Sequence, residues 1–400
     1  MTLKVLVLNS GSSSIKFELF DMPAEKREAG GLLERIGEEQ SKLTYTMGES
    51  KKAIEKKVSD HGQGLRLIID ALTDSSNGGL KDISEIGAVG HRVVHGGEAF
   101  SETALIDDAV QKAVEDHIQL APLHNPPNLM GIKVARELLP KVPQVAVFDT
   151  AFHQSMPKTA YTYPIPYELY EQLRVRRYGF HGTSHRYVAA RAAKMLGRKL
   201  EETNLITAHL GNGASMAAIR NGKSIDTTMG LTPLEGLMMG TRCGDIDPAI
   251  IPFLARVKDM PVGDIDKLLN KKSGVLGISG KSNDMRSIQE ASGNGDERAT
   301  LAFDMYCYRI KKYVGAYTAA IGQVHALVFT AGVGENSVAV RERVLENLGA
   351  LGYHLDADKN RGARGKEVDV ATADSPIRIL VIPTDEELMI AQDTYAIAAK

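Results

Sequence analysis

Short apolar runs and polar turns alternate along the chain, a pattern that predicts β-strands interleaved with helices. Residues 3–8 form an apolar run typical of a strand, and residues 15–20 alternate apolar and polar positions as a half-buried strand does. Between them, residues 9–14 form a turn of hydroxyl, amide and glycine residues. Such a turn can bind phosphate through hydroxyls and backbone N–H groups. Ser and Gly are also ordinary turn residues, so a plain surface hairpin stays open.

The same reading predicts further elements along the chain. Antiparallel strands are expected within residues 30–58, and buried or half-buried strands at 86–90, 144–148, 204–210, 216–219, 326–330 and 377–382. Helices are expected at 64–72, 107–121, 128–139, 187–196, 247–257, 262–270, 297–321 and 338–348, with a last helix that ends the chain. We expect Thr183 or Ser184 to cap the helix at 187–196. Strands alternating with helices indicate an α/β architecture with mixed sheets.

The strand–turn–strand unit at residues 204–219 resembles the opening hairpin. Both units run from an apolar strand ending in Leu, through a turn of Gly, Asn or Ser, into a second strand. Two related domains would produce this weak internal repeat, although hairpins are common enough for chance to produce it as well. A domain boundary is expected just after Asp149.

Composition and charge exclude several classes of protein. The chain has 400 residues, 43% hydrophobic and 24% charged, which is ordinary for a globular protein of two or three domains. The net charge of -2 offers no long-range attraction to nucleic acid or to acidic membranes. No apolar run is long enough for a membrane span, and no signal peptide is recognised. Two cysteines, Cys243 and Cys307, suit a reducing compartment, so we expect a cytoplasmic protein.

Several residues carry candidate chemistry. Gly332-x-Gly334 lies between a predicted strand and a predicted helix, where a nucleotide phosphate is often bound, but it lacks the third glycine of a dinucleotide fingerprint. Asp149 follows a buried strand, and a carboxylate there needs a partner. It would orient an arginine, hold a metal-bound water or act as a base. His181 and His185 are four residues apart, but with the helix cap between them we expect no shared helical face and no zinc.

These stretches together resemble the acetate kinase family over essentially the whole chain. The matching stretches are Asn-Ser-Gly-Ser-Ser-Ser-Ile-Lys at 9–16, Gly-His-Arg-Val-Val-His-Gly-Gly at 90–97, Ala-Pro-Leu-His-Asn-Pro at 121–126, Val-Phe-Asp-Thr-Ala-Phe-His at 147–153, His-Gly-Thr-Ser-His at 181–185, His-Leu-Gly-Asn-Gly at 209–213, Met-Gly-Thr-Arg at 239–242, Gly-Val-Gly-Glu-Asn at 332–336 and Pro-Thr-Asp-Glu-Glu at 383–387. Cys243, Ala331 and Asp385 depart from residues common in the family, and none of them removes a matched catalytic group.

The resemblance implies two duplicated α/β domains of the ribonuclease H-like type found in actin, Hsp70 and sugar kinases, with mixed sheets and ATP in a cleft between them. Residues 1–150 would form the first domain, which a C-terminal helix of about residues 386–400 would rejoin. Residues 151–385 would form the second, nucleotide-binding domain. The resemblance also implies a homodimer.

The resemblance further implies roles for individual residues. Asp149, His181, Arg242 and Arg92 would be catalytic, and Mg²⁺, or alternatively Mn²⁺, would be held by Asn9 and Glu386. Arg92 would also bind the substrate carboxylate, and Val94, Leu123, Phe180 and Pro233 would form the small apolar pocket for the methyl group. His181 would donate to the transition state, with His124 nearby. The residues expected to bind ATP are Ser12, Ser14, Lys16, His209, Leu210, Gly211, Asn212, Gly213, Asp284, Met285, Arg286, Ala331, Gly332, Val333, Gly334 and Glu335.

The implied reaction is the reversible transfer of the ATP γ-phosphoryl group to acetate, giving acetyl phosphate and ADP by direct in-line attack. A carboxylate needs no general base, so the obstacle is repulsion between two anions, which arginines, a histidine and Mg²⁺ offset. A propionate kinase of the same fold is an alternative, because one methylene changes binding by only about 1–3 kcal/mol. A non-catalytic, Hsp70-like nucleotide-binding module is the alternative from another class.

Overall fold

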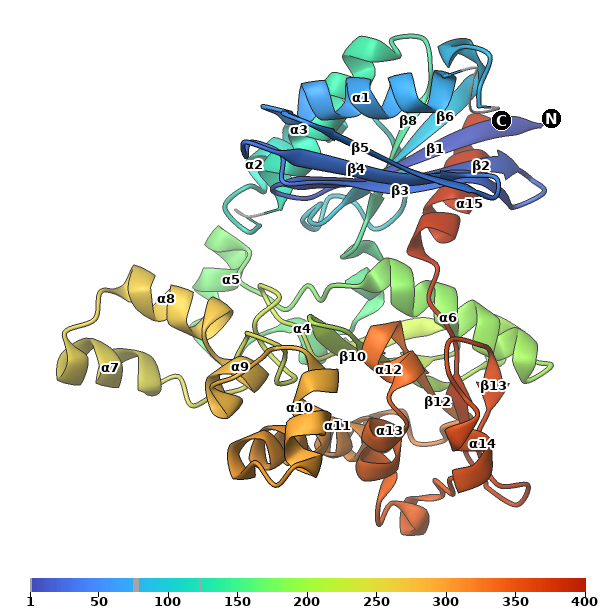
Figure 1. Cartoon of the computed structure of the whole chain (residues 1–400). Helices are drawn as coiled ribbons and strands as arrows, with labels where there is room; N and C mark the ends of the chain where they lie inside the picture. Colours follow the sequence, from blue (N-terminus) through green and yellow to red (C-terminus); the bar gives the residue numbers. More distant parts are fainter. Residues whose placement is uncertain (1, 75–78, 122–123) are drawn as a thin grey trace. The chain divides into compact units, whose positions relative to one another are not determined.

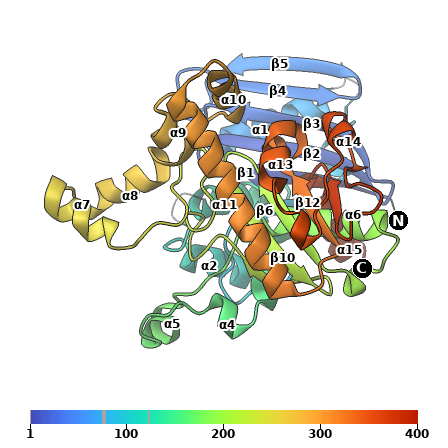
Figure 2. The same ribbon diagram turned by 90° about the horizontal axis from the view of Figure 1, so that it is seen from below.

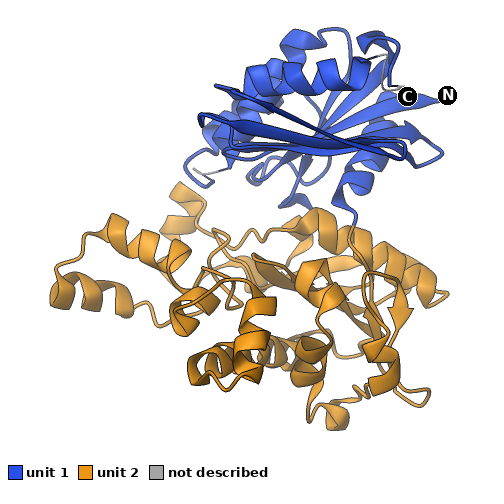
Figure 3. Ribbon diagram, viewed as in Figure 1, with its two compact units in different colours: residues 1–152, 385–400 blue, residues 153–384 orange. Residues whose placement is uncertain are grey.

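The computed structural model describes residues 2–74, 79–121 and 124–400, and the chain divides into two compact units. Unit 1 comprises residues 1–152 and 385–400, and unit 2 comprises residues 153–384. Both ends of the chain belong to unit 1 (Figure 3). Each unit is built on one β-sheet that carries helices (Figure 1).

Unit 1 contains an eight-stranded sheet of order β5-β4-β3-β2-β1-β6-β8-β7. Its strands are β1 (Leu3–Ser10), β2 (Ser14–Met22), β3 (Lys26–Glu34), β4 (Ser41–Met47), β5 (Ser50–Lys56), β6 (Ile86–Val93), β7 (Ala104–Leu105) and β8 (Gln144–Phe148). Its helices are α1 (His61–Thr73), α2 (Asp108–Asp116), α3 (Asn125–Leu138) and α15 (Glu386–Ala398), with 3-10 turns η2 (Ile83–Glu85) and, at the boundary with unit 2, η3 (Ala151–Ser155).

Alternate residues of β1 enter two different cores, which explains why the strand is apolar throughout. Leu6 and Leu8 pack in a cluster with residues of α1 and α3, whereas Val5 and Val7 pack with Ile390 and its neighbours in α15. Helix α15 therefore covers the face of the sheet opposite α1 (Figure 1). With both faces covered, the central strands β1, β6 and β8 are fixed, and their carboxyl ends carry the polar residues described below.

Unit 2 contains a six-stranded sheet of order β11-β10-β9-β12-β14-β13. Its strands are β9 (Leu205–Leu210), β10 (Ala214–Arg220), β11 (Lys223–Thr227), β12 (Ala326–Thr330), β13 (Val368–Asp369) and β14 (Arg378–Val381). Its helices are α4 (Lys158–Tyr161), α5 (Glu168–Leu173), α6 (Gly182–Met195), α7 (Ile250–Lys258), α8 (Val262–Lys271), α9 (Gly274–Ser279), α10 (Met285–Gly293), α11 (Glu297–Ile321), α12 (Ala331–Asn336), α13 (Val338–Leu345) and α14 (Ala357–Arg361), with 3-10 turns η4 (Leu200–Glu202) and η5 (Gly349–Leu351). Helix α6 packs against β9 and β12, and the long helix α11 packs against β9 and β10 (Figure 2).

The two sheets repeat one topology. In unit 1, β1 pairs antiparallel with β2 and parallel with β6, which pairs parallel with β8. In unit 2, β9 pairs antiparallel with β10 and parallel with β12, which pairs parallel with β14. The order β3-β2-β1-β6-β8 thus corresponds to β11-β10-β9-β12-β14. The predicted fold class, two duplicated ribonuclease H-like domains with mixed sheets, is confirmed, and the two hairpin turns occupy equivalent positions.

Most predicted elements are present, although several limits differ from those predicted, among them the limits of α2 and α6. Helix α2 ends at Asp116 rather than at residue 121, because the regular pattern of backbone hydrogen bonds stops there: Asn125 donates to the Val114 oxygen at 3.1 Å, and the Ile118 N–H donates to the Glu115 oxygen instead. Helix α6 begins at Gly182, so neither Thr183 nor Ser184 caps it. In the described residues, no helix has the length and apolar composition that crossing a bilayer requires.

Candidate active site

Three predicted site residues of unit 1 lie at the carboxyl ends of neighbouring parallel strands. Asn9 lies near the end of β1, Arg92 near the end of β6, and Asp149 directly after β8. Because β1, β6 and β8 are parallel and adjacent, their carboxyl ends meet at one edge of the sheet. Ligands of open α/β sheets bind at this edge.

Arg92 and Asp149 form a bidentate ion pair in which the carboxylate is buried and the guanidinium is partly buried. Arg92 Nη2 lies 2.5 Å from Asp149 Oδ2, and Arg92 Nε lies 3.2 Å from Oδ1 and 3.1 Å from Oδ2. Arg92 Nη1 donates to Asn9 Oδ1 at 3.4 Å. Burial alone would lower the pKa of Arg92, but the Asp149 and Glu386 carboxylates outweigh it and raise the pKa. The partner that Asp149 needs is therefore an arginine, and the pair holds the guanidinium in one orientation.

Two glutamates at the start of α15 add negative charge beside this pair. Burial is the main cause that raises the pKa of Glu386 to about 7; Arg92 opposes it, and Asp149 and Glu387 add to it. Glu387 Oε1 lies 2.7 Å from Lys16 Nζ. Carboxylate and amide oxygens are the ligands that Mg²⁺ prefers, and Mg²⁺ is usually held by one or two carboxylates together with substrate phosphates. Asn9 and Glu386 fit such a site, and in the described residues no larger His, Cys, Asp and Glu cluster could hold a metal ion.

The other residues predicted in unit 1 lie on or near the first hairpin and β6. In the turn, the Gly11 N–H donates to the Ser14 oxygen at 2.8 Å, and Ser12 is exposed. Val94 is buried, and Leu123 lies outside the described residues. Sequence reasoning missed Asn128 of α3, which accepts from the Val94 N–H at 3.0 Å and donates to the Ser10 oxygen at 2.8 Å. Asn128 thus joins the ends of β1 and β6, and only its polarity within an apolar helix face could have drawn attention to it.

In unit 2, a histidine and an arginine lie beside the second hairpin turn. A Cβ atom placed on Gly213 would lie 3.5 Å from Arg242 Nη1 and 3.6 Å from both Nε2 and Cε1 of His181. His181 precedes α6 in a left-handed conformation, with a φ of 57°, and its ring stacks on His209 at 4.1 Å. The structure therefore brings together three predicted residues on one side of the turn. Gly213 keeps that space open because it has no side chain.

Backbone contacts, rather than an acidic side chain of the described residues, hold Arg242 in place. Its Nη1 donates to the Pro233 oxygen at 3.1 Å, and in the described part of the chain it forms no ion pair. Burial lowers the pKa of its guanidinium. The loop that carries Arg242 is tied to the hairpin turn, since the Gly240 N–H donates to the Asn212 oxygen at 3.0 Å. A Cβ at Gly240 would collide with Asn212 Oδ1 at 1.9 Å, so this close approach requires glycine.

A cavity of about 770 Å³ in unit 2 adjoins the second hairpin turn. It collects residues from three separately predicted stretches, namely Gly211, Asn212, Asp284, Met285, Arg286, Gly332 and Val333. Gln289, Asn336, Ser337, Glu342 and Arg364 also line it and were not predicted. Its size is that of a small-molecule or cofactor site. Hydrogen bonds from Asn283 to Asn212 (3.0 Å) and from Gln289 to Ser337 (2.6 Å) fix its wall.

Other residues predicted to bind nucleotide do not line this cavity. Gly334 packs against β9, since a Cβ there would lie 3.5 Å from the Ala208 oxygen. Glu335 Oε1 accepts from the Thr384 N–H at 3.1 Å, and burial raises the pKa of its carboxyl group. Residues 331–336, expected as a loop after β12, form the short helix α12 instead. Leu210 and Ala331 are buried and also lie outside the cavity wall.

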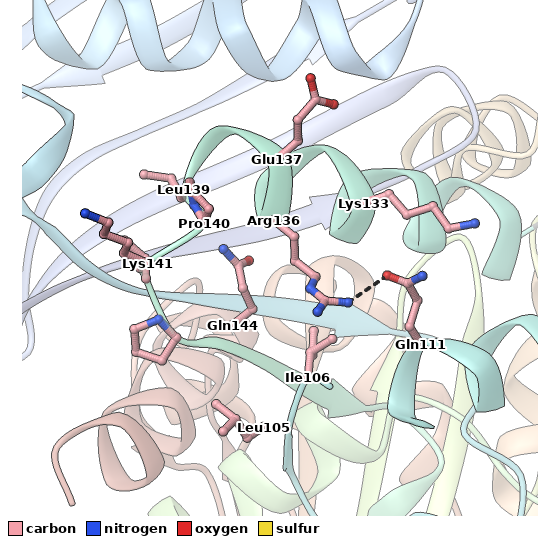
Figure 4. Close-up of a pocket in the computed structure, with 12 residues that line it drawn as sticks. Leu105, Ile106, Gln111, Lys133, Arg136, Glu137, Leu139, Pro140, Lys141 and Gln144 are labelled. Carbon is pink, nitrogen blue, oxygen red and sulfur yellow. Dashed lines mark hydrogen bonds between the residues drawn. The ribbon is translucent and has the colours of Figure 1, made fainter. Parts of the chain in front are cut away.

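A second pocket, in unit 1, lies away from the candidate chemistry. Its volume is about 670 Å³, and residues of α2, α3, β7 and the start of β8 line it, with Arg136 donating to Gln111 at 3.1 Å (Figure 4). Gln144 lies at the amino end of β8, whereas Asp149 follows its carboxyl end. Five residues of strand separate the two by roughly 16 Å.

His181 is the residue before α6 and His185 belongs to its first turn, so the two share no helical face, as expected. Both rings nevertheless contact the same residue, Ser215 of β10. Ser184 is also not a cap; its hydroxyl lies 2.8 Å from His209 Nδ1 and 2.8 Å from the Thr384 hydroxyl. Sequence reasoning missed Ser215, because its partners lie at least 30 residues away and become neighbours only when β10 pairs with β9.

Comparisons with known proteins agree with this geometry. The family model described as the acetokinase family matches residues 4–392. The chain is 57% identical to an acetate kinase of Halothermothrix orenii over 396 residues, which cover 99% of each chain. It is 58% identical to an acetate kinase of Pseudothermotoga lettingae over 395 residues, or 99% of this chain and 97% of the relative.

Solved structures extend the comparison to the fold. An acetate kinase of Porphyromonas gingivalis shares 52% identity at a TM-score of 0.95, covering 99% of both chains. A propionate kinase of Francisella tularensis shares 42% identity at a TM-score of 0.93, covering 98% of this chain and 99% of its own. The family match and the relatives cover nearly all of both units. The chain therefore belongs to the acetokinase family.

Proposed function

We propose that this protein transfers the γ-phosphoryl group of ATP to acetate, reversibly, giving acetyl phosphate and ADP. The observation that carries the proposal is the group Arg242, His181 and Gly213, which adjoins the cavity lined by Asn212 and Asp284 within unit 2. A nucleotide in that cavity would direct its phosphates toward Arg242, which has no acidic partner among the described residues. The 57% identity to an acetate kinase supports acetate as the acceptor.

The reaction needs charge stabilisation rather than proton transfer. An acetate carboxylate is ionised at neutral pH and can attack phosphorus directly, so the barrier comes from repulsion between two anions and from positioning. Arg242 and the His181 N–H would donate to the transferring phosphoryl group, and Arg92 would face the acetate carboxylate. Asp149 already binds Arg92 through both oxygens, so we assign it the orientation of that arginine rather than proton abstraction.

Asn9 and Glu386 are the residues that would hold Mg²⁺, or Mn²⁺, which prefers similar oxygen ligands. The ion, when bound, supplies positive charge to the phosphates of ATP. The fold places the amide oxygen of Asn9 beside Arg92 and the carboxyl groups of Glu386 and Glu387 at the start of α15. Lys16, Ser12 and Ser14 are further proposed contacts to the ATP phosphates. Lys16 also forms ion pairs with Glu387 and Glu18.

A hydroxamate trap for acyl phosphates tests the proposal directly. Purified protein is incubated with ATP and Mg²⁺ and with acetate, propionate or butyrate in parallel, with a reaction lacking acid as the control. We expect trapped product with acetate above the other acids. Greater product with propionate would make the protein a propionate kinase, and no product with any acid would favour a nucleotide-binding module without catalysis.

Two further properties belong to the same proposal. A homodimer follows from the family resemblance, and light scattering coupled to size-exclusion chromatography would report a mass near twice 43.3 kDa. A cytoplasmic location is supported by Cys243 and Cys307, which are both free thiols. A monomer at micromolar concentration would contradict the first property.

A further inference from the structure

A continuous line of hydrogen bonds leads from His181 into the interior of unit 2. His181 Nδ1 lies 2.9 Å from Ser215 Oγ, which lies 2.8 Å from His185 Nε2. His185 Nδ1 in turn lies 2.7 Å from Thr207 Oγ1. Ser215, His185 and Thr207 are fully buried, and β9, β10 and α6 supply one residue each.

The protons on this line can be counted. His185 is buried beside His153 and His209, and burial holds its pKa well below the ordinary value. His185 is therefore neutral, with one ring nitrogen that donates and one that accepts. Ser215 has a single proton for its two histidine neighbours. The line must then run in one direction from end to end, either toward His181 or away from it.

Thr207 decides the direction. In the part of the chain that the structure describes, the Thr207 hydroxyl has His185 Nδ1 as its hydrogen-bond partner and no other. If His185 Nδ1 donated, the Thr207 proton would be buried without an acceptor, which is costly. Thr207 therefore donates to His185 Nδ1, His185 Nε2–H donates to Ser215, and Ser215 donates to His181 Nδ1. A neutral His181 then carries its proton on Nε2, which lies 3.6 Å from the position that a Cβ on Gly213 would take.

Neighbouring groups hold the His181 ring and backbone in place for this arrangement. The ring stacks on His209 at an interplanar angle of 18°, and His209 is anchored by Ser184. His153 Nε2 lies 3.1 Å from the oxygen of Phe180, the residue before His181. These contacts fix the position of the ring, and Ser215 is placed to select which nitrogen carries the proton.

We propose that Ser215 and His185 are positioning residues that hold His181 as the neutral tautomer with its proton on Nε2, ready to donate to the transferring phosphoryl group. This inference rests on the proposed function for its catalytic consequence, but not for the tautomer itself. A donor at Nε2 would otherwise require a protonated imidazolium or a chance tautomer. The hydrogen bonds inside unit 2 thus provide an N–H donor at His181 Nε2 while the ring stays uncharged.

The first test reads the tautomer without turnover. Nitrogen-15 spectra of histidine-labelled protein, with the His181 signals assigned by their loss in H181N, distinguish the two neutral tautomers. Unmodified protein should show the proton on Nε2, and Ser215→Ala should show a mixture or the Nδ1 form. An unchanged His181 spectrum in Ser215→Ala would overturn the proposal, as would an Nδ1–H tautomer in the unmodified protein.

The second test is a double-mutant cycle in the phosphoryl-transfer assay. Ser215→Ala should lower kcat about 10- to 100-fold, and the KM values for ATP and acetate should change by less than about threefold. The reason is that the variant loses only the correct placement of the His181 Nε2–H donor, not substrate binding. In the His181→Asn background the same change should cost no further activity. An equal loss in both backgrounds would show that Ser215 acts independently of His181.

Matched variants separate positioning from folding. Ser375→Ala removes another buried serine hydroxyl of unit 2, one bonded to the Ile377 oxygen, and should leave both kcat and the His181 spectrum unchanged. If Ser215→Ala does not fold, Thr207→Val removes the first donor of the line at nearly constant shape and should also shift the tautomer; an unshifted tautomer in that variant overturns the proposal. Should no acid yield acyl phosphate, the proposed function fails, while the spectra still decide the tautomer.

Discussion

The β1–β2 turn of unit 1 and the β9–β10 turn of unit 2 occupy equivalent positions in two sheets of the same strand order, but the arginine near each turn has different partners. Arg92 makes a bidentate pair with Asp149, whereas Arg242 contacts a backbone oxygen and no described carboxylate. The strand order that the two sheets share therefore sets the position of each turn, whereas the segments that differ between the units determine the partners of each arginine.

The difference arises because one arginine lies on a β-strand and the other on a loop. Arg92 belongs to the central strand β6, next to β8, so the residue after β8 reaches it directly. Arg242 belongs to the long loop between β11 and α7, which unit 1 does not have in this form. The positive charge of Arg92, on a strand, is neutralised by its carboxylate partner, which also fixes its orientation. The positive charge of Arg242, on a loop, is available to attract a bound anion.

Substitution of Arg242 should have the largest effect on activity. Arg242→Ala removes a cation aimed at the transferring group, so kcat should fall about 10²- to 10³-fold, while the folded state loses no ion pair. Steady-state kinetics and a thermal melt on the same preparation check both statements. Arg242→Lys, which keeps the charge but not the planar geometry, should recover part of the rate; full recovery would mean that charge alone is needed.

Substitution of Arg92 should instead be costly to folding. Arg92→Ala leaves the buried Asp149 carboxylate without its bidentate partner, which should lower the free energy of unfolding by about 3 kcal/mol. Urea unfolding, followed by a probe in unit 1, measures this loss. Removing the second charge as well, in Arg92→Ala/Asp149→Asn, should restore part of the stability; an equally unstable double variant would argue against the loss of this ion pair as the cause.

Acid should destabilise unit 1 through His91, the residue before Arg92. His91 is buried against Gln144 at 2.7 Å, and burial lowers its pKa from 6.5 to about 4. The unfolded chain binds a proton below about pH 6.5 that the folded chain does not, so stability is lost as the pH falls from 6.5 toward 4. Between pH 7 and pH 5 the loss should be about 2 kcal/mol. His91→Gln should flatten this dependence, and an unchanged slope would assign it to other groups.

The Mg²⁺ requirement should depend on Asn9 of the β1–β2 turn. Asn9→Ala should raise the Mg²⁺ concentration for half-maximal activity by about tenfold, the lower end of the usual effect of altering a metal's surroundings. Magnesium titrations at saturating ATP measure it, with Ser13→Ala, an exposed residue of the same turn, as the control. Unaltered Mg²⁺ dependence in Asn9→Ala would reduce this hairpin to a structural turn.

Thiol modification should have the smallest effect. Cys243 follows Arg242, and burial raises its pKa, so alkylation at pH 7 should be slow. Once modified, the added bulk should displace the Arg242 loop and reduce activity severalfold, whereas Cys243→Ala should resist the reagent and retain activity. Mass spectrometry establishes the modified site, and full activity after complete modification of Cys243 would refute this prediction.

Elements with an unambiguous pattern could be predicted to the residue. Strands β8 and β12 and helix α11 have the predicted limits, because each is a strongly apolar strand or a regularly amphipathic helix with a clear cap. Helix α12 could not be predicted, since its two glycines disfavour a helix and only tertiary packing compensates. Local sequence thus identifies elements and fails where long-range packing overrides propensity.

The functional site shows the same limit: local sequence identifies candidate residues, but not their partners in the fold. Sequence reasoning predicted that Asp149 needs a partner, but pairing it with Arg92, 57 residues away, required the parallel register of β6 and β8. Ser215, Thr207 and Asn128 were missed because serine, threonine and asparagine occur everywhere in a sequence. Their roles depend on hydrogen bonds that exist only after the sheets have formed.

The most direct test of the account measures kcat and the affinity for ADP on one preparation of Arg242→Ala. If Arg242 serves the transferring phosphoryl group, calorimetry should give a Kd for ADP within about threefold of the unmodified protein, while kcat is at least about 10² lower. If the affinity for ADP falls in step with kcat, Arg242 belongs to the nucleotide site, and the contrast between the two arginines is wrong.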